Sequence, residues 1–212
     1  MLRVVELFIS LQGESTHAGR KCFFIRLEGC NLSCSYCDTA YACSGGKEYS
    51  IDDLAEAAVE SGTGLVEITG GEPLLQSETP QLCRALLDMG LEVMIETNGS
   101  QPIAAVPPEV YRIVDCKLPD SGMADFMLAE NYGELTPRDE VKFVVSSRRD
   151  FDYAVDVCRR YDLVSKTPHL LVSPVWGQVK FDELAQWVIE SDLPLRFQLQ
   201  FHKIIWGNKP GV

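Results

Sequence analysis

Three cysteines stand close together in the segment CNLSCSYCDT, at Cys30, Cys34 and Cys37. Thiolates are soft ligands that favour iron–sulfur clusters or zinc, and most such sites close with four protein ligands. The spacing C-x3-C-x2-C lets three thiolates hold three corners of a compact cluster and leaves the fourth corner open. The segment therefore predicts a metal centre with room for a further ligand.

A closed zinc site is the alternative interpretation. Its fourth ligand would be Cys43, Cys22 or His17, and Cys43 is the best of these candidates. Against it, no second paired motif lies between Cys37 and Cys43, and a large α/β domain has little need of a structural metal. The other cysteines, Cys83, Cys116 and Cys158, stand in apolar helix or strand patterns that are typical of small core residues rather than metal ligands.

Two further segments place ligand-binding residue types where strands are expected to end. In EITGGEP, Gly70 and Gly71 follow an apolar run, and paired glycines let a backbone approach a ligand closely. In IETNG, Glu96, Thr97 and Asn98 are polar groups suited to ribose hydroxyls. An ordinary βα turn is the alternative for the glycine segment. In parallel α/β folds, however, chemistry gathers at the carboxyl ends of strands, which is where these segments fall.

The elements that must position these residues alternate along the chain. Apolar, β-rich runs predict strands at residues 22–29, 65–71, 91–99, 111–119, 140–147, 169–174 and 196–200. Apolar spacing of three and four predicts helices at residues 50–62, 77–90, 148–162 and 180–192. Ser50 or Asp52 is expected to cap the first helix and Ser77 the second.

Strands that alternate with helices predict βαβ units and a parallel sheet. Six or so units in 212 residues fall short of the ~250 that a complete eight-fold barrel needs. We therefore expect an α/β fold, an open, partial TIM-like βα barrel of about six parallel strands. With 46% hydrophobic residues the chain can bury one sizeable core, so a single domain over residues 1–212 is expected.

The charge balance narrows the expected partners. The chain has 19 Lys plus Arg against 31 Asp plus Glu, a formal net charge of −12, and an acidic surface repels a phosphate backbone. Direct binding of nucleic acid is therefore not expected. The opening MLRVVELFISLQGE carries charges through its apolar positions, and no apolar run approaches the ~20 residues of a membrane span. A cytoplasmic protein without membrane contact is the expectation.

On its cysteine triplet the chain resembles the radical S-adenosylmethionine (SAM) enzymes. The resemblance implies a 4Fe-4S cluster on Cys30, Cys34 and Cys37 whose open iron chelates SAM. It also implies an external electron donor and cleavage of SAM to a 5′-deoxyadenosyl radical, chemistry that belongs to the cofactor. The segment with Gly70 and Gly71 would bind the amino group of SAM.

Four segments, SLQGES, FFIRLEGCNLSC, CDT and QLQFHKIIWGN, make the chain similar to the 7-carboxy-7-deazaguanine synthase family. With the glycine segment they span nearly the whole chain. The resemblance implies a truncated barrel that forms a homodimer, a small-molecule pterin substrate, and Mg²⁺ as a further cofactor. The implied reaction converts 6-carboxy-5,6,7,8-tetrahydropterin to 7-carboxy-7-deazaguanine with release of ammonia, in queuosine and 7-deazapurine biosynthesis.

The resemblance also assigns site residues by position. The expected substrate contacts are Leu11, Gln12, Gly13, Glu14, Arg26, Thr69 and His202. The expected SAM contacts are Tyr36, Asp38, Gly71, Glu96, Asn98, Cys116, Lys117, Leu118, Ser173, Pro174, Val175 and Trp176. Thr39 is expected to bind Mg²⁺. At residues 116–118 the chain departs from the more usual serine-proline-lysine pattern, and no general base is evident.

Several of these residues have a structural interpretation as well. Arg26 stands in an apolar strand and needs a partner, which a substrate carboxylate would provide through two hydrogen bonds. The alternative is a partly exposed arginine on an edge strand. Thr39 could instead cap a helix or turn. Glu14 could be a solvated loop carboxylate, and His202 a structural hydrogen-bonding residue that follows a strand.

Two other functions are compatible with the cysteine spacing. An activase for a glycyl-radical enzyme shares the spacing and would need a protein partner, but SLQGES and the tryptophan-containing end of the chain match the deazaguanine synthases. A non-catalytic zinc-binding module is the alternative outside the radical enzymes. The expected activity is therefore that of a carbon–nitrogen lyase.

Overall fold

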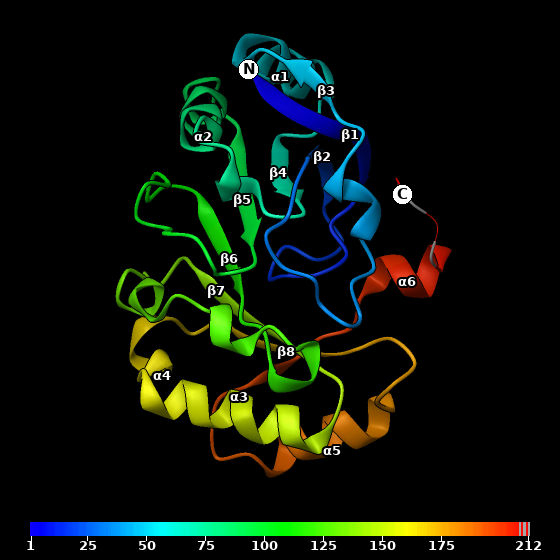
Figure 1. The fold of residues 1–212 in the computed structure, drawn as a ribbon, viewed down its shortest axis with the longest axis vertical. Coiled ribbons are helices and arrows are strands. Elements are labelled where there is room, and N and C mark those ends of the chain that lie inside the picture. Colours follow the sequence, from blue (N-terminus) through cyan, green and yellow to red (C-terminus); the bar gives the residue numbers. More distant parts are fainter. Residues whose placement is uncertain (208, 210, 212) are drawn as a thin grey trace.

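The computed structural model describes residues 1–207, 209 and 211, and its strands form one nine-stranded sheet (Figure 1). In sheet order the strands are β3 (Lys47–Tyr49), β1 (Leu2–Leu11), β2 (Lys21–Leu27), β4 (Leu65–Gly70), β5 (Glu92–Thr97), β6 (Tyr111–Asp115), β7 (Glu140–Val145), β8 (Leu170–Pro174) and β9 (Arg196–Phe197). Neighbours from β2 to β9 are parallel, whereas β1 is antiparallel to β2 and β3. The sheet therefore runs from edge to edge without closing.

The predicted open α/β sheet is confirmed, and every predicted strand forms. The parallel strands number seven rather than about six, because the two-residue β9 still pairs with β8. The sequence reasoning did not include β1 or β3. Charged residues interrupt the apolar run of β1, and the structure explains one of them, since Glu6 lies opposite Arg26 of β2.

The helices are α1 (Ile51–Glu60), α2 (Thr79–Asp88), α3 (Arg148–Arg160), α4 (Leu163–Lys166), α5 (Phe181–Glu190) and α6 (Phe201–Trp206). Helices α1 to α5 join successive strands, and α6 follows the last strand. Short 3-10 turns are η1 (Ala40–Cys43), η2 (Pro73–Leu75), η3 (Pro119–Ser121), η4 (Ala124–Phe126) and η5 (Ala129–Gly133). No helix in the described part of the chain combines the length and the apolar character needed to cross a bilayer.

The two expected helix caps differ in outcome. Ser50 caps α1 in a capping box, in which its Oγ accepts from Asp53 N (3.0 Å) and Asp53 Oδ2 accepts from Ser50 N (3.2 Å). The prediction that Ser77 caps α2 was wrong. Glu78 directly precedes α2, and the Ser77 hydroxyl donates to Glu78 Oε2 (3.0 Å) instead. Pro80 in the first turn tolerates this start because it has no N–H to satisfy.

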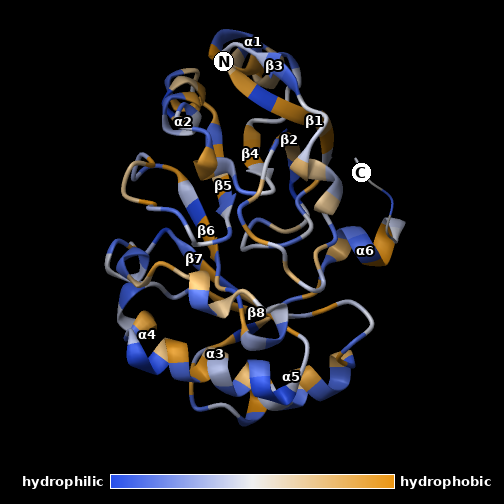
Figure 2. Cartoon of the chain, viewed as in Figure 1, coloured by the Kyte–Doolittle hydropathy of each residue, from blue (hydrophilic) through white to orange (hydrophobic). Residues whose placement is uncertain are grey.

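Helices α1, α2, α3 and α5 pack on the outer face of the sheet through two apolar clusters. One joins α1 and α2 to β1, β2, β4 and β5 and includes Leu54, Leu82 and Ile68. The other joins α3 and α5 to β6, β7 and β8 and includes Phe143 and Phe151. Hydrophobic and hydrophilic stretches alternate along α3 and α5 (Figure 2), as expected for helices with one buried face. These helices therefore leave the inner face of the sheet uncovered.

The inner face carries both apolar and charged side chains. Its apolar part is a small cluster of buried residues that includes Phe24, Met94 and Ile113. Charged residues lie on the same face, because Glu67 pairs in register with Phe24 on one side and Met94 on the other. Side chains alternate between faces along a strand, so Thr69, two residues after Glu67, also points inward.

The segment QLQFHKIIWGN, which carried part of the family resemblance, covers residues 198–208. Its last residue, Asn208, lies outside the described residues. The residues from Phe201 to Trp206 form α6 (red in Figure 1). His202 therefore lies in a helix rather than at a strand end.

Candidate active site

The cysteine segment forms a loop at the carboxyl end of β2. Cys30 and Cys34 are partly buried, and Cys37 is exposed. Cys37 N donates to Cys34 O (3.2 Å), which folds the chain into a turn between these two cysteines. Cys30 Sγ accepts from Leu32 N (3.4 Å) and lies 3.8 Å from Asn98 Nδ2. The loop therefore reaches the end of β5 as well as that of β2.

The donor set of this loop fits a 4Fe-4S cluster held at three corners, because it offers three soft sulfur ligands on one short segment. Burial raises the pKa of the Cys34 thiol, Lys117 opposes this effect, and Cys37 and Cys30 are close enough to add to it. Within the described residues, no three Cys, His, Asp or Glu side chains converge as a bound metal ion requires.

The residues considered for a closed zinc site lie in different surroundings. Cys22 is buried on the inner face of the sheet, and Cys43 is exposed at the end of η1. His17 is buried and packs edge-on against Tyr111, with ring centroids 4.5 Å apart. His17 therefore has the structural role of a packed core residue.

The glycine pair after β4 packs against the cysteine loop with no space for side chains. A Cβ on Gly71 would lie 2.3 Å from Gly29 O and 2.6 Å from Cys30 Cβ. A Cβ on Gly70 would lie 2.3 Å from Leu27 O. Only glycine permits such an approach, and Glu72 N donates to Gly29 O (2.8 Å) to fix it.

Glu72, which the sequence reasoning did not single out, organises the end of β5. Its fully buried carboxylate accepts from Thr97 Oγ1 (2.9 and 3.0 Å), from Asn98 N (2.6 Å) and from Leu74 N (2.9 Å). Burial raises the pKa of Glu72 against the effect of these hydrogen bonds. The carboxylate thereby fixes Asn98 beside Cys30. Its place directly after the two glycines is the signal that could have identified it.

Asp38 and Thr39 lie at the far end of the cysteine loop. Thr39 directly precedes η1, but its hydroxyl makes no capping hydrogen bond and donates to Asp38 Oδ1 (3.0 Å). Asp38 Oδ2 lies 2.5 Å from Lys203 Nζ of α6. Burial would raise the pKa of Asp38, but Lys203, helped by the Thr39 hydroxyl and Lys142, holds it at about 2. The side chain expected to contact Mg²⁺ thus adjoins an ionised carboxylate.

The residues after β1 meet α6. Leu11 ends β1, and Phe201 N donates to Gly13 O (2.9 Å). A Cβ on Gly13 would lie 2.3 Å from His202 Nδ1, so the absence of a side chain at Gly13 lets the imidazole approach the backbone. Burial lowers the pKa of His202, and Glu14 opposes this shift.

Gln12 and Glu14 point into the buried interior of the protein. Gln12 Oε1 accepts from Glu14 N (2.7 Å), and Gln12 Nε2 donates to the Glu67 carboxylate. Gln200 Nε2 donates to Glu14 Oε1 (2.9 Å). Glu14 is thus not the solvated loop carboxylate that was the alternative interpretation.

Arg26 already has a carboxylate partner within the protein. Its Nε donates to Glu6 Oε1 (2.6 Å), and its guanidinium lies 5.6 Å from the ring centroid of Phe8 and 5.8 Å from that of Tyr41. β2 lies between β1 and β4, so the alternative of an edge-strand arginine was wrong. The Nη groups make no hydrogen bond within the described residues, and Thr69 is the neighbour in register on β4.

Lys142, in the interior of β7, is the main site residue that the sequence reasoning missed. It is 3% exposed, and its Nζ lies 3.1 Å from Glu14 Oε2 and 3.9 Å from Asp115 Oδ2. The same Nζ is in direct contact with Glu96 Oε1. The signal was the one that identified Arg26, a charged residue within an apolar strand, here EVKFVV.

Lys142 shapes the ionisation of the carboxylates around it. Burial alone would raise the pKa of Glu14, but Lys142, His202 and the hydrogen bond from Gln200 together outweigh burial, so that pKa is lowered. Burial raises the pKa of Glu96, and Lys142 opposes the shift. Burial and the nearby Glu96 raise the pKa of Glu67 well above its ordinary value. The inner face therefore holds several carboxyl groups around one ammonium.

The expected SAM contacts at residues 116–118 point in different directions. The Cys116 thiol lies in the outer core, 3.1 Å from Tyr132 Oη, and Leu118 is buried there as well. Lys117 Nζ pairs with Asp115 Oδ2 (2.7 Å), near Cys34. Cys116 and Leu118 can therefore make the predicted SAM contacts only through their backbone atoms.

The expected contacts at residues 173–176 follow the end of β8. Ser173 is fully buried, and its Oγ has no hydrogen-bond partner in the described part of the chain. Pro174 and Val175 are buried too, whereas Trp176 is 39% exposed and packs on Phe181. Tyr36 Oη donates to Val144 O (3.1 Å) of the neighbouring β7. The unpaired Ser173 hydroxyl is the group here that offers a hydrogen bond to a ligand.

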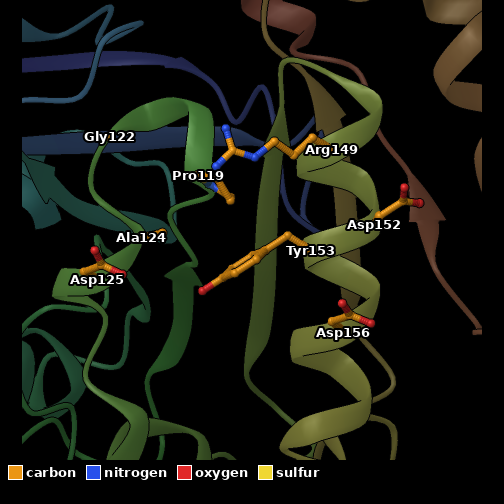
Figure 3. Close-up of a pocket in the computed structure, with 8 residues that line it drawn as sticks. All are labelled: Pro119, Gly122, Ala124, Asp125, Arg149, Asp152, Tyr153 and Asp156. Atoms are coloured by element: carbon orange, nitrogen blue, oxygen red, sulfur yellow. The ribbon is translucent and has the colours of Figure 1, made fainter.

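A separate cavity of about 660 Å³ lies between α3 and the turns η3 and η4 (Figure 3). Its lining residues are Pro119, Gly122, Ala124, Asp125, Arg149, Asp152, Tyr153 and Asp156. None of the expected site residues lines it. We therefore place the candidate active site at the carboxyl ends of the strands and not in this cavity.

Comparison with known proteins identifies the class to which this arrangement belongs. Residues 24–114, from β2 to β6, match the Radical SAM superfamily. The crystal structure of QueE from Escherichia coli superposes with a TM-score of 0.73 and covers 95% of this chain and 94% of that one, at 24% sequence identity. The open βα barrel with its cysteine loop is thus a radical SAM fold, and this class implies a 4Fe-4S cluster and SAM.

Sequence relatives narrow the class further. A 7-carboxy-7-deazaguanine synthase from Koribacter versatilis is 42% identical and covers 97% of both chains. Another, from Chlorobaculum tepidum, is also 42% identical and covers 97% of this chain and 94% of its own. The enzyme of the same name from Thermoplasma acidophilum is 34% identical over 99% of each chain. The chain belongs to the 7-carboxy-7-deazaguanine synthase family.

Proposed function

We propose that this protein converts 6-carboxy-5,6,7,8-tetrahydropterin to 7-carboxy-7-deazaguanine and ammonia, as a radical SAM lyase of 7-deazapurine and queuosine biosynthesis. The observation that carries the proposal is identity of up to 42% over nearly the full chain to relatives named for this product. The relatives favour this function over the activase and the zinc-binding module that the cysteine spacing alone allowed.

In this proposal Cys30, Cys34 and Cys37 hold the cluster, and the chain around them binds SAM. When bound, the cluster and SAM supply a radical that removes a hydrogen atom from the substrate. The close packing of Gly71 on the cysteine loop holds its backbone beside Cys30, where this backbone would contact the amino group of SAM. Further contacts would come from Asn98 beside Cys30 and from the Ser173 hydroxyl. The remaining SAM contacts are proposed on family position alone.

The substrate would lie on the inner face of the sheet. The segment from Leu11 to Glu14 would border this space, with the Gln12 and Glu14 side chains directed inward, and His202 lies against Gly13. Arg26 would bind the pterin carboxylate through its Nη groups while Glu6 holds its Nε. Thr69, beside Arg26 in register, adds a hydroxyl.

The atoms of the proposed substrate equal those of the product plus ammonia, so the conversion needs no net oxidant or reductant. SAM can therefore be regenerated when the hydrogen atom is returned. Mg²⁺ would order the substrate carboxylate and stabilise charge during ring contraction. Thr39 and its neighbour Asp38 offer oxygen atoms for that ion or its water ligands.

Three further properties belong to the proposal. We expect a homodimer, a cytoplasmic location and an external protein or chemical electron donor. Light scattering on the purified protein tests the first, and a monomer at micromolar concentration would contradict it. The acidic net charge of −12 supports the expectation that the protein does not bind nucleic acid directly.

The deciding experiment is anaerobic incubation of the reconstituted protein with reductant, SAM and the carboxytetrahydropterin, followed by mass detection of the deazaguanine. We expect product at the mass of 7-carboxy-7-deazaguanine, with ammonia released in equal amount. Protein with a full cluster that cleaves SAM but forms none of this product would refute the proposed function.

A further inference from the structure

Lys142 occupies an unusual place in the sheet. Only 3% of its surface is exposed. It lies in an interior strand, β7, where the residues on either side of it, Val141 and Phe143, are apolar. Transfer of an isolated ammonium into such a site is costly unless carboxylates surround it. Lys142 meets three of them, in Glu14, Glu96 and Asp115. These partners are therefore the reason that a charged lysine is tolerated here.

The three partners come from parts of the chain that are far apart. Glu14 follows β1, Glu96 is in β5, and Asp115 ends β6. In the sheet, β1 and β7 are separated by β2, β4, β5 and β6. The contact between Lys142 and Glu14 therefore crosses the inner face of the open barrel instead of following the sheet.

Two of these carboxylates belong to different parts of the proposed site, one to the substrate-binding part and one to the SAM-binding part. Glu14 belongs to the expected substrate contacts and Glu96 to the expected SAM contacts, and the ammonium of Lys142 touches both. Asp115 extends the connection, because it also pairs with Lys117 (2.7 Å) near Cys34. One ammonium thus links the substrate side of the site to its cofactor side.

We propose that Lys142 is a positioning residue that holds the Glu14 and Glu96 carboxylates in fixed places relative to each other, so that the pterin and SAM bind in register. The inference rests on the proposed function and deepens it, since it assigns a role to a residue outside the family positions considered above. Lys142 acts through the two carboxylates and not on the reacting atoms.

A purely structural role makes a different prediction, and the protein contains a matched control. Arg112 of β6 is equally buried, at 3% exposed, and pairs with Asp139 through Nε (2.9 Å) and Nη2 (2.6 Å). Its neighbour Ile113 points to the inner face, so Arg112 points to the outer face, away from the site. Loss of either cation leaves buried carboxylates unpaired, but only Lys142 touches expected site residues.

The test uses the reconstituted holoprotein with SAM but without reductant, so that binding is measured without turnover. Calorimetry gives the dissociation constant of the carboxytetrahydropterin for wild type, Lys142→Met, Lys142→Arg and Arg112→Met, beside thermal melting curves. We expect Lys142→Met to weaken pterin binding by about tenfold or more, because Glu14 and Glu96 lose their common partner. Lys142→Arg should recover most of the affinity. Arg112→Met should lower the melting temperature and leave the affinity within about twofold.

If Lys142→Met does not fold, the double variant Lys142→Met/Glu96→Gln replaces it, because removal of one acid lowers the excess negative charge that is buried. Its pterin affinity is compared with that of Glu96→Gln, and the same tenfold weakening is expected. Unchanged pterin affinity in either comparison, or equal weakening by Arg112→Met, overturns the role of Lys142. Wild-type protein that neither binds nor converts the pterin refutes the proposed function itself, and this is seen before any variant is made.

Discussion

Two regions of the candidate site are held together by different forces. The cofactor rim, made of Cys30–Cys37, Gly70–Glu72 and Asn98, depends on close backbone approach and on hydrogen bonds to backbone atoms. The inner charged layer, made of Glu14, Glu67, Glu96, Asp115 and Lys142, depends on buried ion pairs between distant strands. Close packing of backbone atoms fixes the geometry of the cofactor rim, whereas ion pairing fixes that of the inner charged layer.

This difference has consequences for mutation. At the rim an added methyl group meets backbone atoms that cannot move aside, so even small changes are expected to be severe. In the inner charged layer a side chain of similar size and the same charge can substitute, but a neutral one leaves its partners unpaired. Variants ordered by expected effect can therefore test whether the two regions behave as distinct units.

The largest effect is expected at the rim itself. Cys34→Ala, like Ala at Cys30 or Cys37, should abolish cluster loading and all product formation, because two thiolates cannot hold three corners. Iron and sulfide analysis with an activity assay measures this. Cys83→Ala is the control, because Cys83 is fully buried in the outer core and its loss should cost only about 1 kcal/mol of packing. Full iron content and activity in Cys34→Ala would remove the cluster assignment.

Gly71→Ala should rank next. Its Cβ would lie 2.3 Å from Gly29 O, so the cysteine loop must shift. We expect a loss of about 1–3 kcal/mol of stability together with loss of most SAM binding. Gly133→Ala is the matched control, since no atom lies within 4 Å of a Cβ there. Equilibrium SAM binding that is equal in the two variants would show that the rim tolerates shape changes after all.

Arg26 lies between the two regions, next to Thr69 of β4. Arg26→Lys should weaken pterin binding nearly as much as Arg26→Ala, roughly tenfold or more, because an ammonium cannot reproduce the two parallel hydrogen bonds of a guanidinium. The Arg26→Lys variant would also lose the hydrogen bond from Arg26 Nε to Glu6. The exposed pair Arg20–Glu92 provides the control variant Arg20→Lys, which should leave binding unchanged. Wild-type affinity in Arg26→Lys rejects the carboxylate clamp.

The smallest effect is expected at Thr39. If its hydroxyl contacts Mg²⁺, Thr39→Ala should keep the cluster, still cleave SAM, and lose most of the magnesium stimulation of product formation; water can replace one ligand, so activity falls without vanishing. A hydroxyl that only stabilised the turn would cost about 1 kcal/mol of stability and leave the magnesium response intact. Magnesium titrations of turnover beside melting curves separate the two. An unaltered magnesium response together with a lower melting temperature assigns the ion to other oxygens.

The fold could be predicted to a large extent because its strands are locally encoded. Buried parallel strands such as Val141–Val145 and Leu170–Pro174 are nearly continuous apolar runs, which composition alone reveals. β1 was missed because Arg3 and Glu6 interrupt its apolar run, and their partners are known only from the structure. The cap at Ser77 was predicted wrongly for a similar reason, since capping preference describes single positions and not the turn that precedes a helix.

The sequence by itself determined the candidate metal-binding segment, the glycine pair, the order of the parallel strands, and the family, because each of these depends on residues that are close together in the chain. Only the tertiary structure decided that Lys142, and not a residue of a recognised motif, joins Glu14 to Glu96, and that Glu72 fixes the end of β5. Which face a strand residue occupies, and which charge it meets there, depend on register between segments up to 128 residues apart. Local sequence patterns do not reveal those pairings. The stability of a buried charge depends on the other charges in the same low-dielectric surroundings, and these come from distant parts of the chain.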